Sequence, residues 1–456
     1  MNESPRVVNL TMLLDHGKLT KAHVLVIVLC AFVGLLDGAD TQSIGVAAPF
    51  IAKGLGLQIS SFGPVFASSQ LGAAIGALTF GSLADRVGRK TMLIASVLII
   101  AAFTAATISV DTIQALVIVR FFAGLGLGGA TPCFLSLTSD YSPTKYRGTI
   151  ATVVWSSYPL GAALGSFTNA FLLSSVGWRA IFILGSALPV FVAFLILFFL
   201  PESIQYLASN GGNQARIEGL LMRLGHNFRG ANVRFTVEGR KFEGASIRQV
   251  FSDGRAVPTI LLCMVFFFAF ATTNITVMWT PTLLHTNGFT PAETAIVLTF
   301  FNVGAFFSMA AAGRLVDRFG SFLVLFPAFI VASASLGALG LSSTIAVGCV
   351  LGTMLGAAIG VGGAGAVAVA SLIFPAAVRS TGIGCGMSSA RLGQFVAPII
   401  IGLLLASAIS TFRIFSTAAL FPALASVFVV LLSLQRRRRD TVTIDDASEV
   451  LGKRAP

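Results

Sequence analysis

The chain has 456 residues, of which 55% are hydrophobic and only 11% charged, and its formal net charge is +12. Charged residues normally make up about a quarter of a soluble globular domain. This composition excludes a soluble globule and predicts an all-α protein with many membrane-spanning helices.

Twelve apolar runs follow one another, each long enough to cross a hydrocarbon core of about 30 Å. We predict membrane helices at 24–48, 61–82, 91–109, 113–138, 149–173, 179–200, 257–283, 290–313, 321–341, 344–372, 382–408 and 411–434. The first run is too long for the apolar core of a cleavable signal peptide and contains two aspartates.

The segment 201–256 interrupts this pattern, because it is polar and contains eight Lys or Arg residues. It reads as a linker between two six-helix halves. The predicted units are an N-terminal segment (1–23), a first bundle (24–200), the linker (201–256), a second bundle (257–434) and a basic tail (435–456).

One sequence pattern occurs twice. The run GSLADRVG at 81–88 returns as GRLVDRFG at 313–320, an offset of 232 residues. The same offset aligns Pro49 with Pro281, Gly124 with Gly356, Gly128 with Gly360, Pro143 with Pro375, Arg147 with Arg379 and Thr149 with Thr381. A constant offset indicates a duplicated, pseudo-symmetric half, and membrane proteins built in this way are often secondary transporters with a site between the halves.

The distribution of basic residues predicts the orientation in the membrane. With both termini in the cytoplasm, 25 of the 30 Lys and Arg residues lie inside, three lie outside (Lys53, Arg179, Arg413) and two lie within spans. The run Arg436–Arg439 then contacts lipid headgroups, and the positive charge needs no nucleic-acid partner.

Asp37 and Asp40 lie well inside the first predicted span, where a charge is costly unless it is paired or faces water. A spacing of three residues places them on one face of a helix. Mutual repulsion and loss of solvent favour protonation of at least one of them near neutral pH. The alternative is a pair that is simply solvated or salt-bridged at a wet helix end.

Two arginines also lie within spans. Arg120 precedes a glycine-rich run typical of close helix packing, and it is either a fixed partner of Asp37 or Asp40 or a group that responds to their protonation. Arg391 stands near the middle of the eleventh span with no acid in the spans of its own half except Glu293 at a helix start. Such a cation suits a substrate carboxylate, and the alternative is a salt bridge to an aspartate of the other half.

The duplicated pattern places a second group of charges at the inner ends of the spans. We predict that these residues form ion pairs that break and form again as the halves rock, although surface ion pairs can also be inert. The predicted gating residues are Asp85, Arg86, Arg89, Asp140, Arg147, Asp317 and Arg318.

Other chemistries find little support. The chain has no GxxxxGK[ST] phosphate loop for ATP-driven transport. The five cysteines lie in apolar runs without CxxC spacing, and the four histidines are scattered. We therefore expect no enzyme, no metal site and no cofactor other than protons as the coupling ion.

The run GSLADRVGRK at 81–90, its second copy, the Arg120 glycine run and Pro201-Glu202-Ser203 resemble the signatures of the major facilitator superfamily. The run DGADTQ at 37–42 is similar to the DGxD pattern of its aromatic acid:proton symporters, although Ala39 departs from the aromatic residue often found there. Trp279-Thr280-Pro281 and Arg391-Leu392-Gly393 also resemble that family.

The resemblance implies a bacterial inner-membrane symporter that imports a small aromatic carboxylate such as a hydroxybenzoate or phenylpropionate. It implies that Asp37 and Asp40 couple protons, that Arg120 interacts with them, and that Arg391 holds the carboxylate. Other predicted substrate contacts are Trp279, Tyr158, Asn274, Asn302 and Gln394. The rivals are a multidrug or other organic-solute exporter of the same fold, a sugar carrier and a membrane sensor. A monomer in the bilayer is expected.

Overall fold

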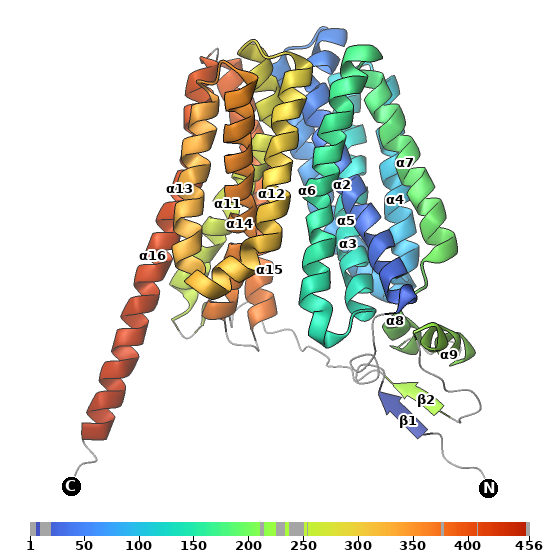
Figure 1. Cartoon of the computed structure of the whole chain (residues 1–456), viewed down its shortest axis with the longest axis vertical. Coiled ribbons are helices and arrows are strands. Elements are labelled where there is room, and N and C mark those ends of the chain that lie inside the picture. Colours follow the sequence, from blue (N-terminus) through green and yellow to red (C-terminus); the bar gives the residue numbers. More distant parts are fainter. Residues whose placement is uncertain are drawn as a thin grey trace.

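The computed structural model describes residues 6–9, 20–209, 214–224, 233–236, 250–252, 254–374, 378–407 and 409–452. Twelve long helices dominate this part of the chain (Figure 1), and each overlaps one predicted span. They are α2 (Lys21–Gly54), α3 (Phe62–Val87), α4 (Arg89–Ala106), α5 (Ile113–Asp140), α6 (Thr144–Ser175), α7 (Trp178–Phe199), α11 (Ala256–Thr286), α12 (Pro291–Phe319), α13 (Ser321–Leu339), α14 (Ile345–Ile373), α15 (Arg379–Ala406) and α16 (Thr411–Gly452).

The predicted twelve-helix class is confirmed by this architecture. Within the described residues, ten of the helices are long and apolar enough to cross a membrane by length and composition. The other two long helices, α3 and α6, contain many Gly, Ser and Thr residues. Figure 1 shows two groups of these helices, α2–α7 on one side and α11–α16 on the other.

The segment predicted as a linker contains structure of its own. Helices α8 (Ile204–Ser209) and α9 (Gln214–Arg223) lie beneath the first group (Figure 1). Ile217 and Leu221, one helical turn apart, are buried in the same apolar cluster as Leu137 of α5. A few apolar side chains at helical spacing anchor this otherwise polar segment to the first bundle.

Two further differences from the prediction lie outside the bundle. Strands β1 (Arg6–Asn9) and β2 (Val233–Thr236) form a short parallel ladder, so the chain is not wholly helical. Helix α16 continues to Gly452, through most of the segment predicted as a separate basic tail.

The duplicated glycines explain how each half is packed. A Cβ on Gly124 or Gly128 of α5 would collide with the backbone oxygens of Ser69 and Ala73 on α3. Their counterparts at the 232-residue offset, Gly356 and Gly360 of α14, meet the backbone of α12 in the same way. Because small residues let helix backbones touch, the duplication preserved one tight helix pair in each half.

The buried apolar clusters show where the two halves join. One cluster contains only residues of the first half and of the linker helices α8 and α9 with their flanking residues, from Val26 to Leu224. Another contains only residues from Val250 to Leu432. A third contains residues of both halves, among them Phe66, Trp279 and Ile401. We call the end of the bundle where α2 ends at Gly54 and α11 ends at Thr286 the closed end, because the shared cluster lies there. The opposite end, where α3 ends at Val87, is the linker end.

Candidate functional site

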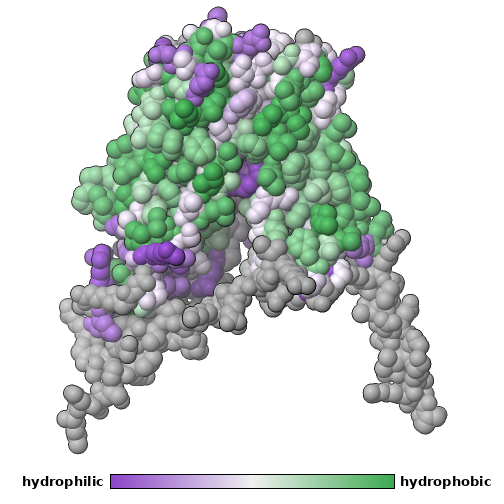
Figure 2. Space-filling model, turned by 180° about the vertical axis from the view of Figure 1, so that it is seen from behind, coloured by the Kyte–Doolittle hydropathy of each residue, from purple (hydrophilic) through white to green (hydrophobic). Residues whose placement is uncertain are grey.

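A cavity of about 530 Å³ lies between the two halves, lined by residues from α2, α3, α5, α6 and from α11 to α15. The lining includes Leu135 and Ala151 of the first half and Met309 and Met387 of the second, which lie toward the linker end. Figure 2 shows a hydrophilic patch in the cleft between two apolar flanks. The molecule is therefore open toward the linker end and sealed at the closed end.

Arg391 of α15 and Asp37 of α2 both line this cavity, one from each half. Their charges interact, but no ion pair within 4.0 Å includes either side chain in the described part of the chain. Arg391 Nη1 donates a hydrogen bond of 3.2 Å to Gln394 Oε1. The guanidinium is thus held in place by an amide of the same helix, and among the described residues it forms no ion pair within 4.0 Å with an acid of the other half.

The two helix-α2 aspartates have different surroundings, although their spacing places them on one side of the helix. Asp37 lines the cavity and accepts a hydrogen bond of 3.5 Å from Thr41. Asp40, 4% exposed, is turned away from the cavity and into the first bundle. Three residues correspond to a rotation of about 300° around an α-helix, so the two side chains point about 60° apart.

Asp40 forms a buried ion pair with Arg120 of α5. Arg120 Nη2 donates to Asp40 Oδ2 over 2.6 Å, and Thr104 of α4 donates to Asp40 Oδ1 over 2.8 Å. Arg120 is fully buried, and its Nε and Nη1 have no hydrogen-bond partner in the described part of the chain. In the described part of the chain, Arg120 therefore pairs with Asp40 and not with Asp37.

Four other predicted substrate contacts line the cavity, namely Tyr158, Asn274, Asn302 and Gln394. Asn302 Nδ2 also donates across the halves to Gln42 Oε1 (3.2 Å). Trp279 does not line the cavity, which corrects its assignment. Its ring is fully buried in the shared cluster, where its Nε1 donates to Pro398 O (3.1 Å) and its ring meets Phe66 edge-on.

Sequence reasoning missed several residues of this region. Gln42 and Thr41 directly follow the DGAD run, and their position in that motif was a usable signal. Thr41, Gln70 and Trp155 line the cavity, and Gln42 bonds to Asn302, which also lines it. Each is a polar or aromatic residue inside a span, but composition alone does not tell a cavity wall from a packed core.

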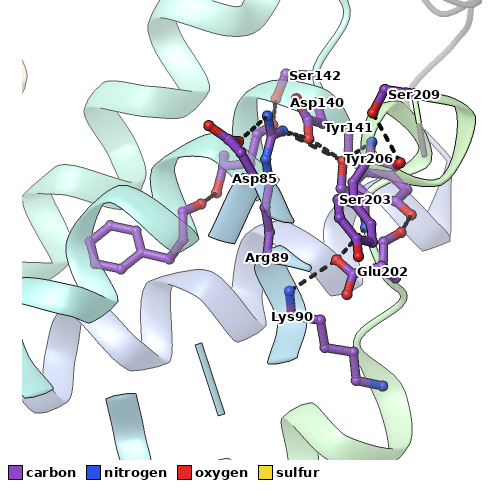
Figure 3. Close-up of polar contacts among 12 residues, drawn as sticks. Asp85, Arg89, Lys90, Asp140, Tyr141, Ser142, Glu202, Ser203, Tyr206 and Ser209 are labelled. Carbon is purple, nitrogen blue, oxygen red and sulfur yellow. Dashed lines mark hydrogen bonds and ion pairs between the residues drawn. The ribbon is translucent and has the colours of Figure 1, made fainter. Parts of the chain in front are cut away.

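Among the described residues, three of the predicted gating residues of the first half, Asp85, Arg89 and Asp140, form a connected cluster (Figure 3). Arg89 pairs with Asp140 of α5 and, at 3.5 Å, with Asp85 of α3. Ser203 donates to Asp140 over 2.5 Å, and Glu202 accepts from the backbone N–H of Lys90 at the start of α4 (3.0 Å). The Pro201–Ser203 segment thus ties the linker ends of α4 and α5 together.

The remaining gating residues are placed differently. Arg147 donates to the carbonyl of Ser142 over 3.4 Å, and the backbone oxygen of Arg86 accepts from Tyr206 (3.1 Å). In the second half Asp317 and Arg318 are exposed. Neither forms an ion pair within 4.0 Å with any described residue. The 232-residue offset places Ser321 at the position of Arg89, which explains the asymmetry.

This asymmetry predicts unequal effects of two matched substitutions. Arg89→Met leaves the carboxylate of Asp140, which is 5% exposed, without its cation. We expect it to lower the free energy of unfolding by about 3 kcal/mol or more, whereas Arg318→Met changes it by about 0.5 kcal/mol or less. Thermal unfolding of the purified protein in detergent measures both, and equal shifts would contradict the structural role of the cluster.

The architecture is that of a secondary transporter, with two similar six-helix halves around a central cavity open at one end. The chain belongs to the sugar (and other) transporter family of the major facilitator superfamily, whose model matches residues 26–445. It is therefore a multi-pass membrane transporter and not an enzyme.

Relatives and solved structures agree with this family. The chain is 30% identical over 438 residues to the gallate transporter of Pseudomonas putida, covering 94% of this chain and 96% of the relative. It is 30% identical over 415 residues to the 3-(3-hydroxy-phenyl)propionate transporter of Escherichia coli (91% and 95%). The crystal structure of a D-xylose-proton symporter superposes with a TM-score of 0.70 at 18% identity, covering 89% of this chain and 97% of that one, which shows the shared fold.

Proposed function

We propose that this protein imports a small aromatic carboxylate together with protons by alternating access. The observation that carries the proposal is Arg391, a cation that lines the central cavity and is bonded to Gln394 and to no acid of the described residues. A planar guanidinium binds a carboxylate with two parallel hydrogen bonds. The 4-hydroxybenzoate transporter of Acinetobacter baylyi, 30% identical over 400 residues (86% of this chain and 87% of the relative), supports an aromatic acid as substrate.

The rest of the cavity suits a ring. Tyr158 and Trp155 of α6 line the first-half wall, and Phe270 of α11 lies on the opposite wall. Aromatic walls bind an aromatic ring by stacking and edge contacts. Amide and hydroxyl groups such as Gln70 and Thr273 provide hydrogen bonds around it.

Protons supply the driving force. Moving one negative charge inward against the membrane potential costs about 2.3 kcal/mol per 100 mV, and one accompanying proton cancels that cost. Asp37 faces the cavity and is the group that binds this proton, while Asp40 and Arg120 form the buried pair that responds to it. No other cofactor takes part.

The transporter acts as a monomer in the bacterial inner membrane, with both termini in the cytoplasm. The linker end is then the cytoplasmic end, and the structure corresponds to an inward-open state. The halves at 24–200 and 257–434 rock about the cavity, and the gating charges at the linker end pair differently when it closes.

Uptake of radiolabelled 4-hydroxybenzoate into proteoliposomes with an imposed pH gradient tests the proposal. Wild-type protein is expected to accumulate the acid, and Arg391→Gln to lower kcat/KM about 30-fold or more, because a charge-assisted hydrogen bond contributes about 2–3 kcal/mol. Arg413→Gln, an exposed arginine at the closed end, is the matched control and retains uptake.

Two outcomes would contradict import of an aromatic acid. One is wild-type protein that takes up no member of a panel of benzoates, hydroxybenzoates and phenylpropionates under a pH gradient. The other is extrusion of cationic dyes that Arg391→Gln leaves unchanged, which would identify an exporter instead.

A further inference from the structure

One amide on the cavity wall has no hydrogen-bond partner in the described part of the chain. Gln70 of α3 is 7% exposed and lines the cavity. Its side chain bonds to no described residue, yet neither of its amide atoms is sealed inside the protein. Buried polar groups are nearly always hydrogen-bonded. An amide that reaches the cavity without a partner is therefore placed to bond to a ligand.

Each of the other amides of the wall has an atom that is bonded or sealed. Gln394 accepts a hydrogen bond from Arg391, and Asn302 donates one to a glutamine of α2. Asn274 Oδ1 is buried without a partner and has no access to the cavity. Among the described amides that line the cavity, Gln70 is thus the one whose NH₂ group and oxygen are both accessible and unpaired.

Gln70 lies at the depth of Arg391. α3 begins at the closed end and α15 ends there, so the two helices run in opposite directions. They meet where a Cβ on Gly63 would lie 3.1 Å from the carbonyl oxygen of Pro398. Gln70 follows Gly63 by seven residues and Arg391 precedes Pro398 by seven, which is about 10 Å along each helix. The two side chains therefore line the cavity from opposite halves at about the same level.

A carboxylate between these two walls has room for both groups. Its two oxygens accept about four hydrogen bonds, and a guanidinium supplies two of them. The remaining lone pairs of a carboxylate on Arg391 are free for a donor on the opposite wall, and the Gln70 NH₂ group is such a donor. Asp37, the acid that lines the cavity within the described residues, carries a proton in the proposed cycle and so does not compete for the two donors.

We infer that Gln70 is a second carboxylate-binding residue, so that the bound carboxylate links the first half, through Gln70, to the second half, through Arg391. The inference rests on the proposed function and adds the group on the first half that holds the substrate. A ligand that bonds to both halves favours the state in which the two walls are close together. Binding of the carboxylate then contributes directly to closure of the linker end.

The test compares benzoate, whose one polar group is the carboxylate, with 4-hydroxybenzoate in uptake into proteoliposomes under a pH gradient. Gln70→Leu is expected to lower kcat/KM about tenfold for both acids alike, because a hydrogen bond to a charged group is lost. Gln114→Leu makes the same chemical change at an exposed position of α5 outside the cavity, and it leaves both values unchanged.

Gln70→Glu distinguishes contact with the carboxylate from a structural role. Glutamate has the size and shape of glutamine, so a side chain needed only for packing tolerates Glu better than Leu. At the level of Arg391 the new carboxylate instead repels the substrate anion and competes for the guanidinium. We therefore expect Gln70→Glu to lower kcat/KM about 100-fold or more for both acids, below Gln70→Leu.

Gln70→Asn keeps the donor on a shorter side chain and should lose less activity than Gln70→Leu. With Gln70→Glu it keeps the inference open to refutation if Gln70→Leu does not fold. Uptake by Gln70→Glu at the wild-type rate, or a loss confined to 4-hydroxybenzoate, would overturn the carboxylate contact, and the second result would assign Gln70 to the ring hydroxyl. Failure of the wild type to transport any aromatic acid would instead refute the proposed function.

Discussion

Asp37→Asn is expected to abolish uphill accumulation while leaving exchange of labelled for unlabelled substrate intact. The asparagine cannot release a proton, so the carrier would move the anion alone. At a potential of 100 mV, negative inside, the cost of about 2.3 kcal/mol then excludes the anion about 50-fold at steady state. Exchange of labelled for unlabelled substrate needs only substrate binding at Arg391 and movement of the halves. The Asp37→Asn variant retains both.

Proteoliposomes with imposed pH and potential gradients separate the two activities. The ratio of internal to external substrate reports accumulation, and the rate of label exchange reports binding and movement. Thr41→Val, which removes the 3.5 Å hydrogen bond to Asp37 but keeps the carboxylate, is the control and should still accumulate substrate. Full accumulation by Asp37→Asn would assign the proton to another group.

Asp40→Leu is expected to be the most destabilising of the cavity-region substitutions. It leaves the fully buried guanidinium of Arg120 without its carboxylate, and Nε and Nη1 already lack partners among the described residues. Removing one partner of a buried ion pair costs about 3–5 kcal/mol. Asp37→Leu should cost less, because the described residues provide no ion pair for Asp37 and its side chain borders the cavity.

The double variant Asp40→Leu/Arg120→Met tests the physical reason. Replacing both charges by apolar groups removes the uncompensated cation, so most of the lost stability should return. Thermal unfolding in detergent gives the three values. An additive loss in the double variant would mean that Arg120 is not stabilised chiefly by Asp40.

Much of the fold followed from patterns in the sequence. Apolar runs located the twelve long helices of the described residues. The 232-residue offset predicted two similar halves, and the glycine contacts of Gly124 and Gly356 agree with it. The short ladder β1–β2 and the packing of Ile217 and Leu221 were not predicted. Both depend on contacts between segments whose local sequence is mainly polar.

The sequence predicted which residues belong to the site better than it predicted where their side chains point. Charge inside an apolar run identified Asp37, Asp40, Arg120 and Arg391, since such residues are costly without a role. Spacing could not tell that Asp40 turns toward Arg120 while Asp37 faces the cavity. Trp279 showed a further limit, because a motif places a residue on a helix but not on the side that meets the substrate.

The apolar cluster shared by both halves has a consequence for the transport cycle. Opening the closed end exposes Phe66, Trp279 and Ile401 to water and breaks the Gln42–Asn302 hydrogen bond, whereas the clusters at the linker end are already confined to one half each. The empty carrier is therefore expected to rest open at the linker end. Opening of the closed end is then expected to be the slow step of each turnover, and small side chains that replace residues of the shared cluster should speed it up.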